Sequence, residues 1–316
     1  MSSFDNTIIT NSNDTRFVIE IENGPSFSKL FTYLKFSSDS VIRLTKNSMT
    51  YNELITKQIE GSNKKSYLNI NNTIDFDVKK FKMFIFDSPN PEYNLFINVK
   101  SFQERVGKII KNNSIKIYKE SKDEHIYIQT SDNTADSEGI SFITPLNMQN
   151  CEIFTHPSST KDEDNPNCTI NLKKFKMECS KISSNEHKQI KLIGYNKRME
   201  IHAVSENGLE GHIFKHSNTN NVITDGAKID LKKIKINGFV LNTSNDDYLD
   251  LDNHPILINL SVNLLKNISR LTQISDYPFK VFFEKKENYI KIITSIKEYA
   301  KLTIYIQDNQ SIDDDI

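Results

Sequence analysis

The sequence predicts an α+β fold of two similar domains, in each of which antiparallel sheets are covered by two short helices. Three observations lead to this prediction. A unit of strand, short helix, strand and strand occurs four times along the 316 residues. The four units form two pairs, separated by a segment rich in Ser, Pro and acidic residues. A hydrophobic content of 37% is typical of a chain that folds around buried cores.

Each copy of the repeated unit is marked by a change in the spacing of its apolar residues. Alternation with a period of two gives way to apolar residues at i, i+3, i+4 and i+7 for about three turns. The period of two then returns for two strands joined by turn signals such as "ESKDE" and "YNK". Fixed self-similarity of this kind indicates the architecture more strongly than any single motif. The copies span residues 16–53, 93–129, 168–204 and 255–293.

The domain boundaries follow from the pairing of the repeats. The segment "HPSSTKDEDNPN" is the best linker candidate, so we predict domains at 1–155 and 168–316 with a connecting loop at 156–167. Further strand-like runs lie between the repeats, and the chain ends in an acidic tail. These runs are "SYLNINNTIDF", "KFKMFIF", "ISFITPL" and "CEIFTHP" in the first half, and "GLEGHIFKHS", "KIKINGFVL" and "LTIYIQDNQ" in the second.

Composition excludes several classes of protein. The 40 basic and 41 acidic residues give a net charge of −1, so any nucleic-acid surface must be a local patch. Cys151, Cys168 and Cys179 form no metal-like pair and no even-numbered disulfide framework, which predicts free thiols in an intracellular, reducing compartment. The N-terminus lacks the apolar core of a signal peptide, and no apolar run is long enough to span a bilayer.

The predicted helices carry basic residues on the faces opposite their apolar stripes. In the third repeat, "INLKKFKMECSKI", the apolar side is formed by Leu172, Phe175, Cys179 and Ile182. The corresponding stripes of the other repeats contain Phe27 to Leu34, Val99 to Ile110 and Leu265 to Thr272. The acids on the exposed faces are only Glu104 and, more obliquely, Glu178. The basic residues are Lys29, Lys35, Lys100, Arg105, Lys108, Lys111, Lys173, Lys174, Lys176, Lys181, Lys266 and Arg270.

This segregation of charge predicts contact with nucleic-acid phosphates. Lysine on a single helix often does no more than keep the surface soluble, and that interpretation stays open for each helix alone. Four equivalent helices with the same bias favour binding to the phosphate backbone. Lysine is a flexible point charge that reads bases poorly, so we expect contact with double-stranded DNA that is salt-sensitive and independent of sequence.

The repeats, their pairing, the acidic linker and the acidic tail resemble the DNA sliding clamps of the proliferating cell nuclear antigen family. The likeness is closest in residues 168–218 and 255–307 and extends over nearly the whole chain from Arg16. The resemblance implies the DNA clamp fold and a homotrimeric ring, closed head-to-tail by edge strands, whose basic helices encircle DNA. It also implies a processivity factor without catalytic activity or cofactor, which tethers DNA polymerase and other replication and repair proteins.

The resemblance further implies a groove for short partner peptides between the linker and the tail. Carried onto this sequence, the groove would involve Ile153, Phe154, Pro157, Ile306, Gln307 and Asp308, and, as a weaker candidate, Leu54, which is expected in the loop after "SMTYN". The chain departs from the family in three ways. Its linker lacks the usual Leu/Ile-rich core. The stretch 60–92 is longer than the corresponding stretch of the family, and the net charge is near neutral where the family is usually acidic. These differences and the Asn-, Ile- and Lys-rich composition suggest a divergent viral clamp, working in the nucleus or at a cytoplasmic viral replication site.

No motif for catalysis, metal or nucleotide binding meets its requirements. Gly107-Lys108 lacks the glycine and hydroxyl of a phosphate loop, and His212 and His216 have helical spacing within a strand. The acidic segments 161–165 and 245–252 look solvated, and the aromatic residues are expected in core positions. Two alternatives remain: an open, monomeric or dimeric clamp-fold factor for a polymerase or for viral late transcription, and a metal-dependent nuclease using "NDDYLDLD".

Overall fold

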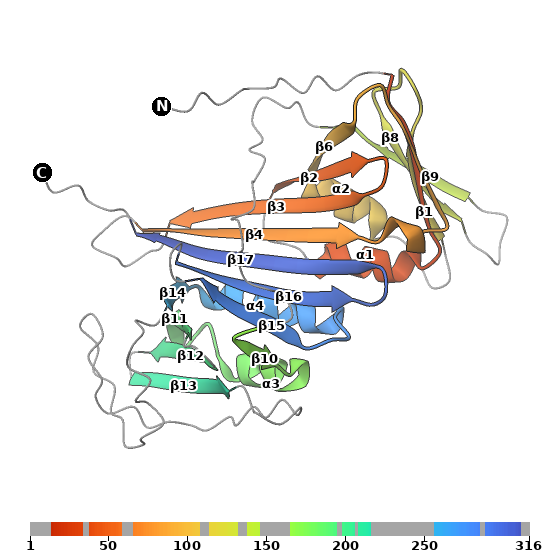
Figure 1. Cartoon of the computed structure of the whole chain (residues 1–316). Coiled ribbons are helices and arrows are strands. Elements are labelled where there is room, and N and C mark those ends of the chain that lie inside the picture. Colours follow the sequence, from red (N-terminus) through yellow and green to blue (C-terminus); the bar gives the residue numbers. More distant parts are fainter. Residues whose placement is uncertain are drawn as a thin grey trace, which may run out of the picture. The chain divides into compact units, whose positions relative to one another are not determined.

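The chain folds into two compact units of mixed α+β structure, seen in the computed structural model (Figure 1). The N-terminal unit comprises Met1–Asn52 and Asp75–Ile153, and the C-terminal unit comprises Glu53–Ile74 and Phe154–Ile316. Both consist mostly of antiparallel strands with few helices. The structure describes residues 14–33, 38–58, 66–107, 114–131, 138–145, 165–194, 198–205, 208–215, 256–284 and 288–310.

The predicted order of strand, helix, strand and strand is confirmed in all four repeats. The first two repeats are β1(Arg16–Ile21), α1(Gly24–Tyr33), β2(Asp39–Thr45), β3(Met49–Gln58), and β6(Glu92–Asn98), α2(Val99–Val106), β7(Ser114–Lys119), β8(Ile126–Ser131). The other two are β10(Cys168–Ile170), α3(Leu172–Lys181), β11(His187–Gly194), β12(Arg198–Ser205), and β14(Ile256–Leu260), α4(Val262–Arg270), β15(Phe279–Glu284), β16(Tyr289–Ile296).

The remaining elements follow the repeats. The runs "SYLNINNTIDF", "ISFITPL", "GLEGHIFKHS" and "LTIYIQDNQ" form strands as predicted. The run "KFKMFIF" does so only in its second part, because Asp77 caps a 3-10 helix before it. The predicted strands "CEIFTHP" and "KIKINGFVL" lie outside the described residues. These elements are β4(Ser66–Phe76), η1(Val78–Lys80), β5(Met83–Asp87), β9(Glu138–Ile143), β13(Gly208–Lys215), η4(Leu271–Gln273) and β17(Ala300–Gln310).

Paired repeats exchange strands reciprocally within each unit. In the N-terminal unit β1 pairs with β7 and β2 pairs with β6, so the first strand of each repeat joins the second strand of the other. The C-terminal unit repeats this arrangement, with β10 on β15 and β14 on β11. The strand orders are β5-β1-β7-β8-β9 and β6-β2-β3 in the N-terminal unit, and β10-β15-β16-β17-β4 and β14-β11-β12-β13 in the C-terminal unit.

Each helix begins at a polar cap in the same place in its repeat. The side-chain oxygens of Asn23, Asn98, Asn171 and Ser261 accept hydrogen bonds from backbone N–H groups of the first helical turn. Such caps satisfy donors that have no partner inside the helix. The equivalent position of all four caps fixes where each strand ends and each helix starts.

The two helices of each unit contact one another and bury their apolar faces. In the N-terminal unit the ring of Phe31 lies 4.9 Å from Phe102 and 5.2 Å from Tyr51, measured between ring centres. In the C-terminal unit Phe175 packs edge-on against Phe279 at 5.5 Å. The predicted apolar faces are confirmed at most described positions, but Leu172 and Thr272 are only half-buried. Leu34, Ile109 and Ile110 lie outside the described residues.

Candidate nucleic-acid interface

The basic residues of α3 and α4 lie on the surface of the C-terminal unit. The two helices contain six basic residues and one acidic residue, Glu178, so their net charge is +5. Lys174 and Lys266 are half-exposed, and Lys173, Lys176, Lys181 and Arg270 are exposed. The Asn171 side chain accepts hydrogen bonds from the backbone N–H of Lys173 (3.0 Å) and Lys174 (3.2 Å). This cap holds the first turn, so the lysine side chains leave from a fixed backbone.

The helices of the N-terminal unit carry fewer basic residues within their described parts. Helices α1 and α2 together carry Lys29, Lys100 and Arg105 against Glu104, a net charge of +2. Lys29 and Lys100 are exposed, and Arg105 is half-exposed. Lys35, Lys108 and Lys111 lie outside the described residues. The two helix pairs therefore share a plan but differ in charge.

The placement of Glu178 on an exposed helix face is wrong. Its side chain is buried at the inner edge of α3, where both carboxylate oxygens accept hydrogen bonds from the Lys181 ammonium at 2.7 and 2.8 Å. A buried carboxylate needs such a partner. Lys181 is thus engaged within its own helix, which helical periodicity could not reveal because Glu178 lies between the two faces. Lys173 and Lys176 are the more freely exposed lysines of this helix.

Both arginines of the predicted surface also have partners within the chain. Arg105 donates from Nε to the backbone carbonyl of Phe142 at 3.2 Å, and Arg270 donates from a terminal nitrogen to Asn267 Oδ1 at 3.3 Å. The guanidinium group has five N–H donors, so each arginine retains donors for a phosphate oxygen. These contacts hold Arg105 against β9 and Arg270 along its own helix.

The residues expected in the partner-peptide groove are only partly described. Leu54 lies within strand β3, so its expected place in a loop is wrong. Ile306 is fully buried in β17, whereas Gln307, next to it, is half-exposed. Asp308 also lies within this strand, which ends at Gln310. Ile153, Phe154, Pro157 and most of the linker lie outside the described residues.

A row of aromatic residues around a lysine was missed by sequence reasoning. Phe282, Lys291 and Tyr305 are direct neighbours in register on β15, β16 and β17. The Lys291 ammonium lies 5.6 Å from the Phe282 ring centre and 5.8 Å from that of Tyr305. Tyr289 packs against Tyr305 at 5.7 Å. The row lies opposite Ile306 in the pleat, and the signal for it was the alternation "TIYIQ" in β17.

Reactive cysteines and metal ligands do not form a site in the described part of the chain. Cys168 and Cys179 are buried in the C-terminal core, where loss of hydration raises the pKa of both thiols, to about 12 for Cys179. Across the described residues, no cluster of three or more His, Cys, Asp or Glu could hold a metal ion. His216 and the acidic segments 161–164 and 245–252 lie outside them.

No family model matches the sequence, and no curated protein matches it. In the described part of the chain, no helix is long and apolar enough to cross a membrane.

Proposed function

We propose that this chain is a DNA sliding clamp that encircles duplex DNA and tethers DNA polymerase and other replication or repair proteins. The observation that carries the proposal is the repeated design of each unit: reciprocally paired strands support two helices whose exposed faces are basic. Helices of this kind suit the phosphate backbone without reading sequence. The resemblance to the proliferating cell nuclear antigen family supports the same function.

The sheet edges support closure between copies of the chain. In the C-terminal unit β17 lies next to β4, whereas β9 and β13 each lie at the end of a sheet. Strand β9 has the position in its repeat that β17 has, and β13 has the position of β4. By this equivalence, β9 of one copy pairs with β13 of the next. A contact between two different edges is head-to-tail and closes into a ring when the rotation allows it.

Mass and DNA topology test the proposal together. Light scattering should give about three times the chain mass of 36.5 kDa for a trimeric ring. A loaded ring should stay on circular DNA and slide off linear DNA with free ends. Equal retention on both would contradict encirclement, and a mass of one or two chains would favour the open clamp-fold factor.

Charge placed on the edge strand tests closure separately. Ile140 is exposed on β9, and Ile140→Lys should lower the mass towards that of a single chain because a lysine on an edge strand opposes edge pairing. Tyr277→Lys is the matched control, since Tyr277 is also exposed but lies outside any strand. If both variants keep the mass of the native protein, β9 is not the closing edge.

A further inference from the structure

An apolar row crosses the outer face of the five-stranded sheet in the N-terminal unit. Register places Ile85 of β5 opposite Val18 of β1, which lies opposite Tyr118 of β7. Tyr127 of β8 and Phe142 of β9 continue the row. Directly opposed residues of antiparallel strands share one face, so these five side chains form one line. With strands about 4.8 Å apart, the line extends about 19 Å.

Exposed apolar side chains gather on this face. Among the described residues, six large hydrophobic side chains are exposed, and four of them lie here: Met83, Ile85, Ile140 and Phe142. Met83 and Ile140 end the neighbouring row, which runs through Glu20, Lys116 and Gln129. Phe142 is 53% exposed, so the expectation that the aromatic residues occupy core positions is wrong for it. Apolar groups concentrated on one face mark an interaction surface more often than scattered ones do.

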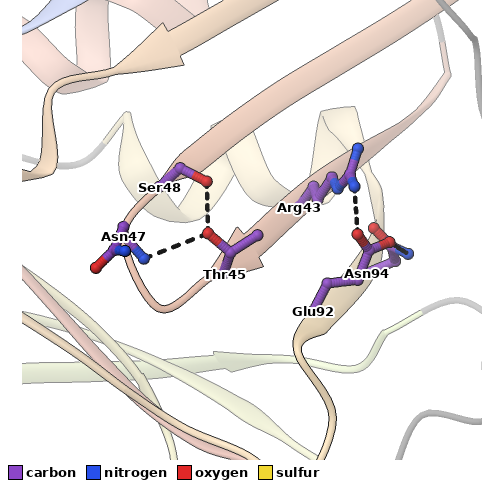
Figure 2. Close-up of polar contacts among 6 residues, drawn as sticks. All are labelled: Arg43, Thr45, Asn47, Ser48, Glu92 and Asn94. Atoms are coloured by element: carbon purple, nitrogen blue, oxygen red, sulfur yellow. Dashed lines mark hydrogen bonds and ion pairs between the residues drawn. The ribbon is translucent and has the colours of Figure 1, made fainter.

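In the strands β6-β2-β3 of the same unit, the face that carries Arg43 is polar towards the turn between β2 and β3. There Arg43 of β2 forms an ion pair with Glu92 of β6, and Asn94 donates to the same carboxylate (Figure 2). Thr45 and Ser48 are joined by a hydrogen bond at the adjoining turn (Figure 2). Farther along this face Val41 and Phe96 are opposed to one another, and both are buried. Among the described residues of this unit, the exposed large apolar side chains therefore lie on the five-stranded sheet.

The C-terminal unit contains an equivalent row, which is covered. Phe282, Lys291 and Tyr305 occupy the three strands β15-β16-β17, as Tyr118, Tyr127 and Phe142 occupy β7-β8-β9. In the C-terminal row all three side chains are buried. The same place in the fold is thus buried in one unit and open in the other.

The rings and charges around the row favour a polypeptide over a nucleic acid. Tyr118 and Tyr127 stack on one another at 5.2 Å, and His125 packs against Phe142 at 5.0 Å, so ring faces are already in use. The turn 120–125 carries three carboxylates and one lysine, and Arg16 of β1 pairs with Glu120 at 3.3 Å, so a net charge of −1 remains around Asp123 and Glu124. The backbone N–H of His125 and the Tyr127 hydroxyl hydrogen-bond to Asp123, lower its pKa and keep it ionised. These charges repel phosphates and attract basic side chains.

We propose that this row docks an extended segment of a partner protein with bulky apolar residues at alternate positions and a basic residue beside the turn 120–125. An extended segment rises about 3.3 Å per residue, so about six residues span the row. Apolar side chains at every second position of this segment lie about 6.6 Å apart, so three of them lie along the row between Ile85 and Phe142. The partner's lysine or arginine lies near Asp123 and Glu124. The site does not depend on DNA encirclement.

Selection of peptides on the intact protein tests this site. A random twelve-residue display library is panned against the full chain, and the recovered peptides are measured on Ile85→Ser, Phe142→Ser and Tyr277→Ser. Ile85, Phe142 and Tyr277 are 40%, 53% and 52% exposed, so none of the variants should unfold, and circular dichroism checks this. We expect alternating apolar peptides with a basic end. Their affinity should fall at least tenfold in the first two variants and stay unchanged in Tyr277→Ser.

Several outcomes would overturn the proposal. Peptides that bind all variants equally, or a selection that enriches no peptide dependent on this face, exclude the site. Binding of a twelve-residue oligothymidylate that is lost in Ile85→Ser assigns the face to single-stranded nucleic acid. A fall in molecular mass in Ile85→Ser assigns it to a second copy of the chain, because β5 lies at the sheet edge opposite β9. Failure of ring closure alone would leave the peptide result intact.

Discussion

Phe142 lies on the last of the strands β7-β8-β9 in the N-terminal unit, and Tyr305 lies on the last of the equivalent strands β15-β16-β17 in the C-terminal unit. Phe142 is nevertheless exposed, whereas Tyr305 is buried. The described helices differ in a similar way: the net charge is +2 for α1 with α2 and +5 for α3 with α4. Both units nevertheless exchange the same strands and cap their helices at the same positions. Their backbone plan is shared, and their surfaces have diverged.

The largest expected effect concerns the two cores. Phe31 contacts the rings of Phe27, Tyr51 and Phe102, and Phe175 contacts the ring of Phe279. Truncation to alanine should cost about 3–5 kcal/mol of unfolding free energy at each site, because it removes a buried ring and aromatic pairs worth about 0.5–1.5 kcal/mol each. Urea denaturation measures both. Lys29→Ala and Lys173→Ala are the exposed controls, expected within about 0.5 kcal/mol of the native protein.

The next effect tests whether the charge difference between the helix pairs matters for DNA. Lys173→Glu with Lys176→Glu should weaken binding to duplex DNA by tenfold or more, and Lys29→Glu with Lys100→Glu should weaken it less. Loss of two phosphate contacts lowers the slope of log affinity against log salt by about 2. Fluorescence anisotropy at several salt concentrations measures this slope.

The matched control for this comparison lies in η1, where Lys79 and Lys80 are both exposed and lie outside the four helices. Lys79→Glu with Lys80→Glu changes the net charge by the same amount and should leave the slope unchanged. An equal loss in all three double variants would show that overall charge, and not the helix faces, controls binding. Lys181 is unsuitable for this test because its replacement would leave Glu178 buried without its partner.

The smallest effect concerns one buried lysine in each unit. Burial lowers the pKa of Lys119 on β7 and of Lys191 on β11 below the ordinary value of 10.5. Between the lowered pKa and 10.5 the unfolded chain binds more protons than the folded one, so stability should rise with pH across this window and level off above it. Lys191→Met should remove the part of this increase in stability with pH that comes from Lys191. Thermal unfolding at several pH values measures the change.

Lys119→Met provides the comparison within this pair. The Lys119 ammonium donates to the Thr15 carbonyl at 3.0 Å, so its loss should lower stability at every pH in addition to flattening the rise. If stability falls with pH between the lowered pKa and 10.5 in the native protein, neither lysine has the depressed pKa assigned to it.

Local sequence predicted the elements because local physics decides them. The period of two, the period of 3.6 and the polar caps are set within a few residues, and all four repeats were located from them. The exposed positions of Lys173 and Lys176 followed from the same periodicity. The burial of Glu178 did not, because a residue between two helix faces is assigned by the elements packed around it.

The sequence by itself determined a fourfold repeat of strand, helix, strand and strand, with basic residues opposite the apolar helix faces. Only the tertiary structure decided which strands exchange, that residues 53–74 group with the C-terminal unit, and that five apolar side chains distant in the chain align across one sheet. The physical reason is the range of the interactions. Periodicity and capping act between near neighbours, whereas register and burial depend on strands that meet only after the chain has folded.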